Sequence, residues 1–102
     1  MKKYTLYVGL NDKDERVQMI DTIRAKKMVH QILNHDMTML EGEGRYIHQD
    51  GGVSHEVSLK IELVDLKGEL EKTIRGKVAK IKQVLNQETV AVQVEEVVSE
   101  LW

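Results

Sequence analysis

The chain has 102 residues, of which 41% are hydrophobic and 31% are charged, and its formal net charge is −2. This length builds one domain, 1–102, and the mixture of apolar residues with both charge signs excludes a disordered protein. The absence of cysteine excludes disulfides, thiolate nucleophiles and cysteine-bound metal centres. The small net charge argues against a nucleic-acid or membrane partner. No segment has the apolar length of a signal peptide or a membrane span, so we expect a cytoplasmic protein.

The first third of the chain predicts a strand followed by a helix. Apolar and polar residues alternate over 3–10, which is the period of a half-buried strand. After a polar loop, Asp21 is a suitable N-cap for a helix that runs to about Asn34. Residues at helical spacing form one apolar stripe, made of Ala25, Met28, Val29, Ile32 and Leu33. Ile23 lies outside this stripe, and we interpret it as a local contact or as part of an oligomer surface.

Two further strands are predicted at about 38–48 and 53–63, with Asp50-Gly51 between them as a two-residue hairpin turn. This turn places Glu41 opposite Lys60, whereas a turn one residue later would set like charges opposite each other. We therefore prefer the first register. It places the carboxylates of the second strand on the face of the sheet that the helices leave open.

The remainder of the chain predicts a second helix and a last strand. Apolar spacing defines a helix from about Gly68 to Leu85, and the alternation of Val90, Val92 and Val94 defines the strand. The resulting order is that of a ferredoxin-like α+β sandwich, βαββαβ, with a four-stranded antiparallel sheet and two helices on one face. An apolar extension follows at 97–102, in which we interpret four residues as oligomer contacts: Val97, Val98, Leu101 and Trp102.

The segment from Tyr7 to Lys13, Tyr-Val-Gly-Leu-Asn-Asp-Lys, resembles the end of the first strand in small PII-like proteins and in the similar divalent-cation-tolerance proteins. The order of elements is similar to that family over nearly the whole chain. The resemblance implies a trimer whose subunits pack their sheets around a central axis. PII signalling proteins carry a long loop between strands two and three that helps to bind nucleotide, whereas this chain has a tight turn there. We therefore transfer no binding residue from the family and expect no cofactor.

Two groups of residues have side chains suited to chemistry. On the predicted open face, Tyr7, Glu41 and Glu43 offer a phenol and two carboxylates, which suit ligand binding or acid–base catalysis if a neighbouring subunit encloses them. Near the hairpin turn, His48 lies diagonally from His55, and two imidazoles at this separation suit zinc, copper or nickel with a carboxylate as third ligand. Exposed carboxylates and histidines more often only solvate a surface.

The open face argues against RNA binding, a function of other domains with this topology. RNA-recognition domains stack bases on aromatic residues of the central strands, whereas the run Glu-Val-Ser-Leu-Lys-Ile-Glu at 56–62 has none. Our leading hypothesis is a PII-like, non-enzymatic homo-oligomer, favoured as a trimer, with a regulatory or interaction role. The alternatives are a small enzyme with an inter-subunit site on the open face, and a histidine-based metal-binding protein.

Overall fold

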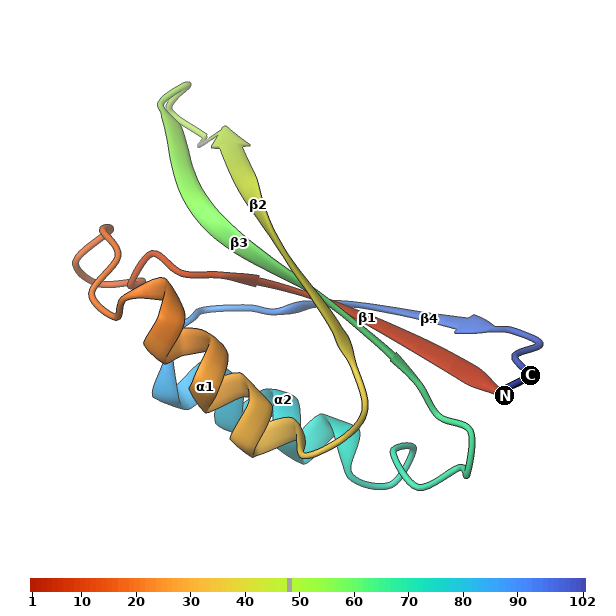
Figure 1. Ribbon diagram of the computed structural model, residues 1–102. Helices are drawn as coiled ribbons and strands as arrows, with labels where there is room; N and C mark the ends of the chain where they lie inside the picture. The colour runs from red at the N-terminus through yellow and green to blue at the C-terminus, as the bar shows by residue number, and fades with distance from the viewer. Residues whose placement is uncertain (48) are drawn as a thin grey trace.

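The computed structural model describes residues 1–47 and 49–102, which form a four-stranded sheet and two helices (Figure 1). The elements in chain order are β1 (Lys2–Gly9), α1 (Thr22–Leu33), β2 (Thr38–Ile47), β3 (Val53–Val64), α2 (Ile74–Val84) and β4 (Ala91–Glu96). Neighbouring strands are antiparallel, and their order across the sheet is β2-β3-β1-β4. The ferredoxin-like α+β fold predicted from the sequence is confirmed.

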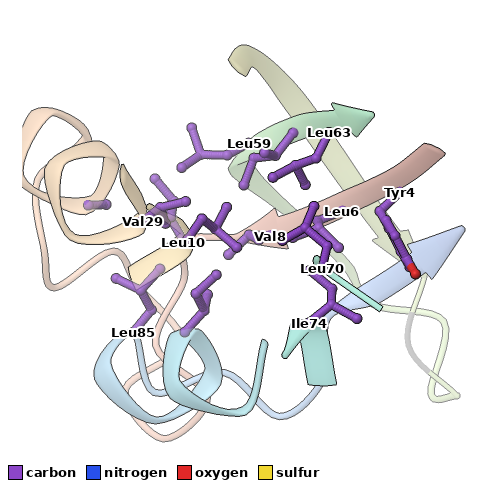
Figure 2. Close-up of a cluster of buried hydrophobic side chains, with 14 residues drawn as sticks. Tyr4, Leu6, Val8, Leu10, Val29, Leu59, Leu63, Leu70, Ile74 and Leu85 are labelled. Atoms are coloured by element: carbon purple, nitrogen blue, oxygen red, sulfur yellow. The ribbon is translucent and has the colours of Figure 1, made fainter. Parts of the chain in front are cut away.

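Both helices lie against one face of the sheet and leave the other face open (Figure 1). The core fills the space between the helices and the two central strands, and its side chains are aliphatic apart from Tyr4. Figure 2 shows side chains of β1 and β3 meeting those of α1 and α2, among them Leu6, Val8, Val29, Leu59, Leu63 and Ile74. Complete burial of one such leucine or valine contributes roughly 1.5–3 kcal/mol.

Helix α1 begins where the sequence predicts because Asp21 caps it. The Asp21 carboxylate accepts a hydrogen bond of 2.9 Å from the N–H of Arg24. At the other end Asn34 adopts the left-handed conformation with a φ of 44°, and its N–H donates to the carbonyl of His30. Ile23 lies outside the buried stripe, as predicted, and is 70% exposed.

Helix α2 begins at Ile74, later than the predicted start at Gly68. Gly68 has a φ of 71°, which interrupts an α-helix. The chain first makes a turn held by Asp65, whose carboxylate accepts hydrogen bonds from the N–H groups of Leu70 at 3.0 Å and Glu71 at 3.2 Å. Leu70 fits the apolar stripe and is buried, but in a turn rather than in the helix. Among the helices of the described chain, none is long and apolar enough to cross a membrane.

The connection between β2 and β3 is longer than predicted. The last described pair of the hairpin is Ile47 with Val53, and residues 49–52 belong to neither strand, so more than Asp50-Gly51 connects them. Gly51 has a φ of 86°, and the N–H of Gly52 donates to the Asp50 carboxylate at 2.8 Å. The predicted two-residue turn is therefore wrong, although the turn residues lie in the connection.

The register of this hairpin reverses the two faces of β2. Glu41 lies opposite Leu59 and not opposite Lys60, so the predicted register is wrong by one residue. Because side chains alternate along a strand, this shift moves every side chain of β2 to the other face. The observed register places Met39 against the core, so packing decided it. The prediction relied on opposite charges alone. The open face of β2 carries Leu40, Gly42, Gly44 and Tyr46.

Candidate functional site

A groove of about 410 Å³ lies on the open face of the sheet. Its lining comes from the sheet, from the loop after β1 and from the connection between α2 and β4. The sheet contributes Tyr7, Gly9, Tyr46, Ser54, Glu56 and Ala91. The sheet part of the groove therefore combines two aromatic rings, the Glu56 carboxylate and several small residues, which is a composition suited to a small ligand.

Glu56 is the carboxylate that the sheet holds in this groove. It folds over Gly9, where an added Cβ would lie only 2.3 Å from Glu56 Oε1. The second carboxylate oxygen, Oε2, accepts a hydrogen bond of 2.8 Å from the backbone N–H of Asn11. The absence of a side chain at Gly9 and the backbone donor together fix the position of this carboxylate.

Tyr46 lies beside Glu56 because a second glycine leaves room for its ring. Gly44 is opposite Glu56 in the β2–β3 pair, and an added Cβ at Gly44 would lie 3.0 Å from the Tyr46 ring. Partial burial, and then the charge and hydrogen bond of Glu56, raise the pKa of Tyr46 above its usual value of 10.0. The Tyr46 hydroxyl therefore keeps its proton at neutral pH, next to the Glu56 carboxylate.

Tyr7 supplies the second aromatic ring of the groove. It lies opposite Lys60 in β3 and opposite Ala91 in β4. The Lys60 ammonium is 6.0 Å from the centre of the Tyr7 ring, at the outer limit of a cation–π interaction. The small side chain of Ala91 leaves space beside the ring, where a planar or cationic ligand group can pack.

Asp12 also lines the groove, but its carboxylate is occupied by the protein. Its Oδ2 accepts hydrogen bonds of 3.0 Å from the N–H groups of Asp14 and Glu15, and its Oδ1 accepts one of 2.9 Å from the side-chain amide of Asn86. The backbone bond from Glu15, followed by the bond from Asn86, lowers the pKa of Asp12 below its usual value of 3.8. Asp12 therefore stabilises the loop after β1 in its ionised form.

The structure brings one of the three predicted open-face residues into the groove. Tyr7 lines it, whereas Glu41 and Glu43 lie on the helix side of β2. Glu41 forms an ion pair with Lys26 of α1, and the Glu43 carboxylate lies 3.0 Å from His55 Nδ1. The predicted combination of a phenol and two carboxylates does not form, because the one-residue change in register places both glutamates on the other face.

The predicted metal site at His48 and His55 stays a prediction, since His48 lies outside the described residues. The His55 side chain is 57% exposed and makes the contact with Glu43 described above. Within residues 1–47 and 49–102, no group of three His, Cys, Asp or Glu residues is placed to hold a metal ion.

The residues predicted as oligomer contacts lie mostly on the surface. The exposed fractions are 70% for Ile23, 91% for Val98, 87% for Leu101 and 107% for Trp102. Val97 is half-buried, and its N–H donates to the Met1 carbonyl at 2.8 Å. Their role in an oligomer stays a prediction.

A second groove, of about 560 Å³, lies on the helix side between α2 and β4. Valines of β4 and apolar residues of α2 form much of its lining. At its edge the Lys2 ammonium lies 2.7 Å from the Glu71 carboxylate, and this bond raises the pKa of Lys2. The two opposite charges are already paired within the protein.

Sequence reasoning missed the pair formed by Tyr46 and Glu56. The signal that could have revealed it is the presence of Gly9 and Gly44 inside predicted strands. Glycine weakens a strand, and it often marks a position where another group approaches the backbone closely. Here the approaching groups are the Glu56 carboxylate and the Tyr46 ring.

Comparison with known proteins gives structural neighbours only. No protein-family model matches the chain, and no curated protein matches its sequence. A solved structure of a phage SAM lyase in complex with S-methyl-5'-thioadenosine matches with a TM-score of 0.68 and 21% identity, over 93% of this chain and 80% of the other. The apo structure of a phage SAM lyase matches with a TM-score of 0.63 and 24% identity, over 92% and 78% of the two chains. At these identities the similarity establishes the fold.

These neighbours correct the predicted function. The matching structures are of a phage SAM lyase and not of PII proteins, so the prediction of a PII-like regulatory protein is wrong. The order of elements was misleading because unrelated functions share the ferredoxin-like fold. The alternative prediction, a small enzyme with a site on the open face, agrees better with these neighbours.

Proposed function

We propose that this chain is a small enzyme that cleaves SAM (S-adenosylmethionine) in the open-face groove and releases S-methyl-5'-thioadenosine. The observation that carries the proposal is the Glu56 carboxylate, held over Gly9 and beside Tyr46 on a fold similar to that of the phage SAM lyase. The similarity of fold suggests the reaction class. The groove adds chemical groups that fit the substrate.

The side chains of the groove suit a sulfonium ligand. SAM carries a positively charged sulfur atom between an adenosyl group and an aminobutyrate group. A carboxylate attracts such a cation, and so does the face of an aromatic ring. Glu56 offers the first, and Tyr7 and Tyr46 offer the second. S-Methyl-5'-thioadenosine is neutral at sulfur, so the groove binds this product less tightly than the substrate.

The proposed reaction breaks the bond between the sulfonium sulfur and the γ-carbon of the aminobutyrate group. The electron pair of this bond stays with sulfur, which becomes the neutral thioether of S-methyl-5'-thioadenosine. Because a lyase adds no water, the carboxylate of the remaining fragment bonds to its own γ-carbon and closes a lactone, and the ammonium keeps the positive charge. The step transfers no proton, which fits a groove in which Glu56 already accepts a hydrogen bond from the backbone N–H of Asn11. The protein contributes by holding the reacting groups together.

Incubation of the purified protein with SAM, followed by liquid chromatography and mass spectrometry, tests the proposal. We expect S-methyl-5'-thioadenosine and the amino lactone in equal amounts, above the level in a protein-free control. Folded protein that forms no S-methyl-5'-thioadenosine would refute the proposed activity. An unsaturated amino acid in place of the lactone would refute ring closure, because that product requires a base to remove a β-proton.

We also propose that the chain acts in the cytoplasm as a homo-oligomer, with the trimer as the favoured form. The exposed apolar residues support this assembly, including Leu40, which is 54% exposed on the open face of β2. A second subunit over that face would exclude water from the groove. Light scattering at micromolar concentration, compared with a chain truncated after Glu96, tests the assembly. A monomer in both samples would contradict it.

A further inference from the structure

The loop after β1 carries two positive charges into the open-face groove. Lys13 and Arg16 both line the groove, and both side chains are exposed. Within the part of the chain that the structure describes, no ion pair joins either cation to a carboxylate. Among the described residues, three with a carboxylate line the groove. Two of them, Asp12 and Glu56, accept hydrogen bonds from the protein itself. The remaining one, Glu88, is exposed at the rim.

The backbone of this loop is closed on itself. Asn11 and Gln18 form an isolated β-bridge, and the N–H of Asp12 donates to the Val17 carbonyl at 2.8 Å. The N–H of Arg16 donates to the Asp12 carbonyl, also at 2.8 Å. Arg16 has a φ of 60°, a left-handed conformation that is uncommon for arginine and is kept here by these bonds.

The loop is also attached to the connection between α2 and β4, which forms another wall of the groove. The side-chain amide of Asn86 donates to Asp12 Oδ1 and to Asp14 Oδ2, each at 2.9 Å. The side-chain amide of Gln87 donates to the Asn11 carbonyl at 2.8 Å. The backbone that carries the two cations is therefore fixed before a ligand arrives, which lowers the entropic cost of binding.

We infer that Arg16, assisted by Lys13, binds the α-carboxylate of the substrate. This inference rests on the proposed function, since SAM carries an α-carboxylate. The planar guanidinium of arginine matches the geometry of a carboxylate better than other cations do. The product S-methyl-5'-thioadenosine has no carboxylate, so this subsite distinguishes the substrate from the product that leaves.

Two stable ligands separate this subsite from the rest of the groove. S-Adenosylhomocysteine has the aminobutyrate group without the sulfonium charge, and S-methyl-5'-thioadenosine has neither. Titration calorimetry of the unaltered protein and of Arg16→Gln measures both affinities. We expect the Kd for S-adenosylhomocysteine to rise about tenfold to a hundredfold, as loss of a charged hydrogen bond predicts, and the Kd for S-methyl-5'-thioadenosine to change less than about twofold.

Matched variants show whether the effect belongs to this position. Arg16→Lys keeps the charge and should restore part of the affinity for S-adenosylhomocysteine, and Lys13→Gln should give a smaller loss than Arg16→Gln. Lys67→Gln removes an exposed charge outside the groove and should change neither Kd. An unchanged Kd for S-adenosylhomocysteine in Arg16→Gln would overturn this inference but not the proposed function. An equal loss of affinity for both ligands would do the same. Failure of the unaltered protein to bind either ligand would overturn the proposed function together with this inference.

Discussion

The two grooves of this protein differ in what fixes their polar groups. The helix-side groove between α2 and β4 is larger, about 560 Å³ against about 410 Å³ for the open-face groove. At its edge Lys2 and Glu71 pair with each other. In the open-face groove the backbone N–H of Asn11 holds Glu56 beside Tyr46, and among residues 1–47 and 49–102 no cation forms an ion pair with this carboxylate. Each groove also carries two cations without an ion-pair partner among those residues: Lys13 and Arg16 on the open face, and Arg75 and Lys82 on the helix side.

The size of a groove alone therefore does not identify a ligand site. In the helix-side groove the carboxylate of Glu71 is already neutralised by Lys2, so the larger groove offers little that would attract a cationic ligand. Fixed polar groups supply orientation because the protein has already placed them, and their charge need not reorganise during a reaction. Substitutions that change one groove at a time test this distinction.

The largest effect is expected from removing the negative charge in the open-face groove. Glu56→Gln should lower the rate of S-methyl-5'-thioadenosine formation by about a hundredfold or more, because the charge that attracts the sulfonium is lost. Glu71→Gln, the matched change in the helix-side groove, should leave the rate within about twofold. Initial rates with SAM measure both. Similar losses in the two variants would remove the distinction between the grooves.

A somewhat smaller loss is expected from Gly9→Ala. The new Cβ would lie 2.3 Å from Glu56 Oε1, and the flexible end of Glu56 can move away, so the fold survives while the carboxylate is displaced. We expect a rate loss of about tenfold to a hundredfold and a loss of about 1 kcal/mol of stability with the hydrogen bond from Asn11. Gly42→Ala is the control, since its nearest contact would be Ser58 O at 4.0 Å. Equal rates in the two variants would contradict the role of Gly9.

A modest, pH-dependent effect is expected at Tyr46. Its pKa is raised in the folded protein, so its protonated form contributes stability that is present below the unfolded pKa of about 10 and is lost as the pH rises through the folded value. The effect is small because Tyr46 is 47% exposed. Above pH 10, urea unfolding should show stability falling less steeply in Tyr46→Phe than in the unaltered protein. Identical slopes would argue against the contact with Glu56.

The smallest effect on activity is expected from Gly76→Ala in α2. An added Cβ at this position meets nothing within 4 Å, so the change should stabilise the helix by up to about 1 kcal/mol. For a domain of this size that corresponds to an increase of roughly 4–8 °C in Tm. Calorimetry measures the shift, and the rate with SAM should not change. A large change in rate would connect the helix side with the reaction.

The sequence determined the fold class and the order of the elements. Alternation defined β1 and β3, and Asp21 defined the start of α1, because these are local signals that neighbouring residues produce together. It also indicated the core, since the apolar stripe with Ala25, Val29 and Leu33 is buried as expected. The later start of α2 followed from the backbone conformation of Gly68, which the periodic pattern did not reveal.

Only the tertiary structure decided the site. A strand has a period of two residues, so a shift of one residue in the β2–β3 pair exchanged Glu41 and Glu43 for Gly44 and Tyr46 on the open face. The sequence contained both possibilities, and packing of β2 against the core selected one. The carboxylate of the groove, Glu56, then obtained its position from Gly9 on a strand distant in sequence, a contact that no local pattern can specify.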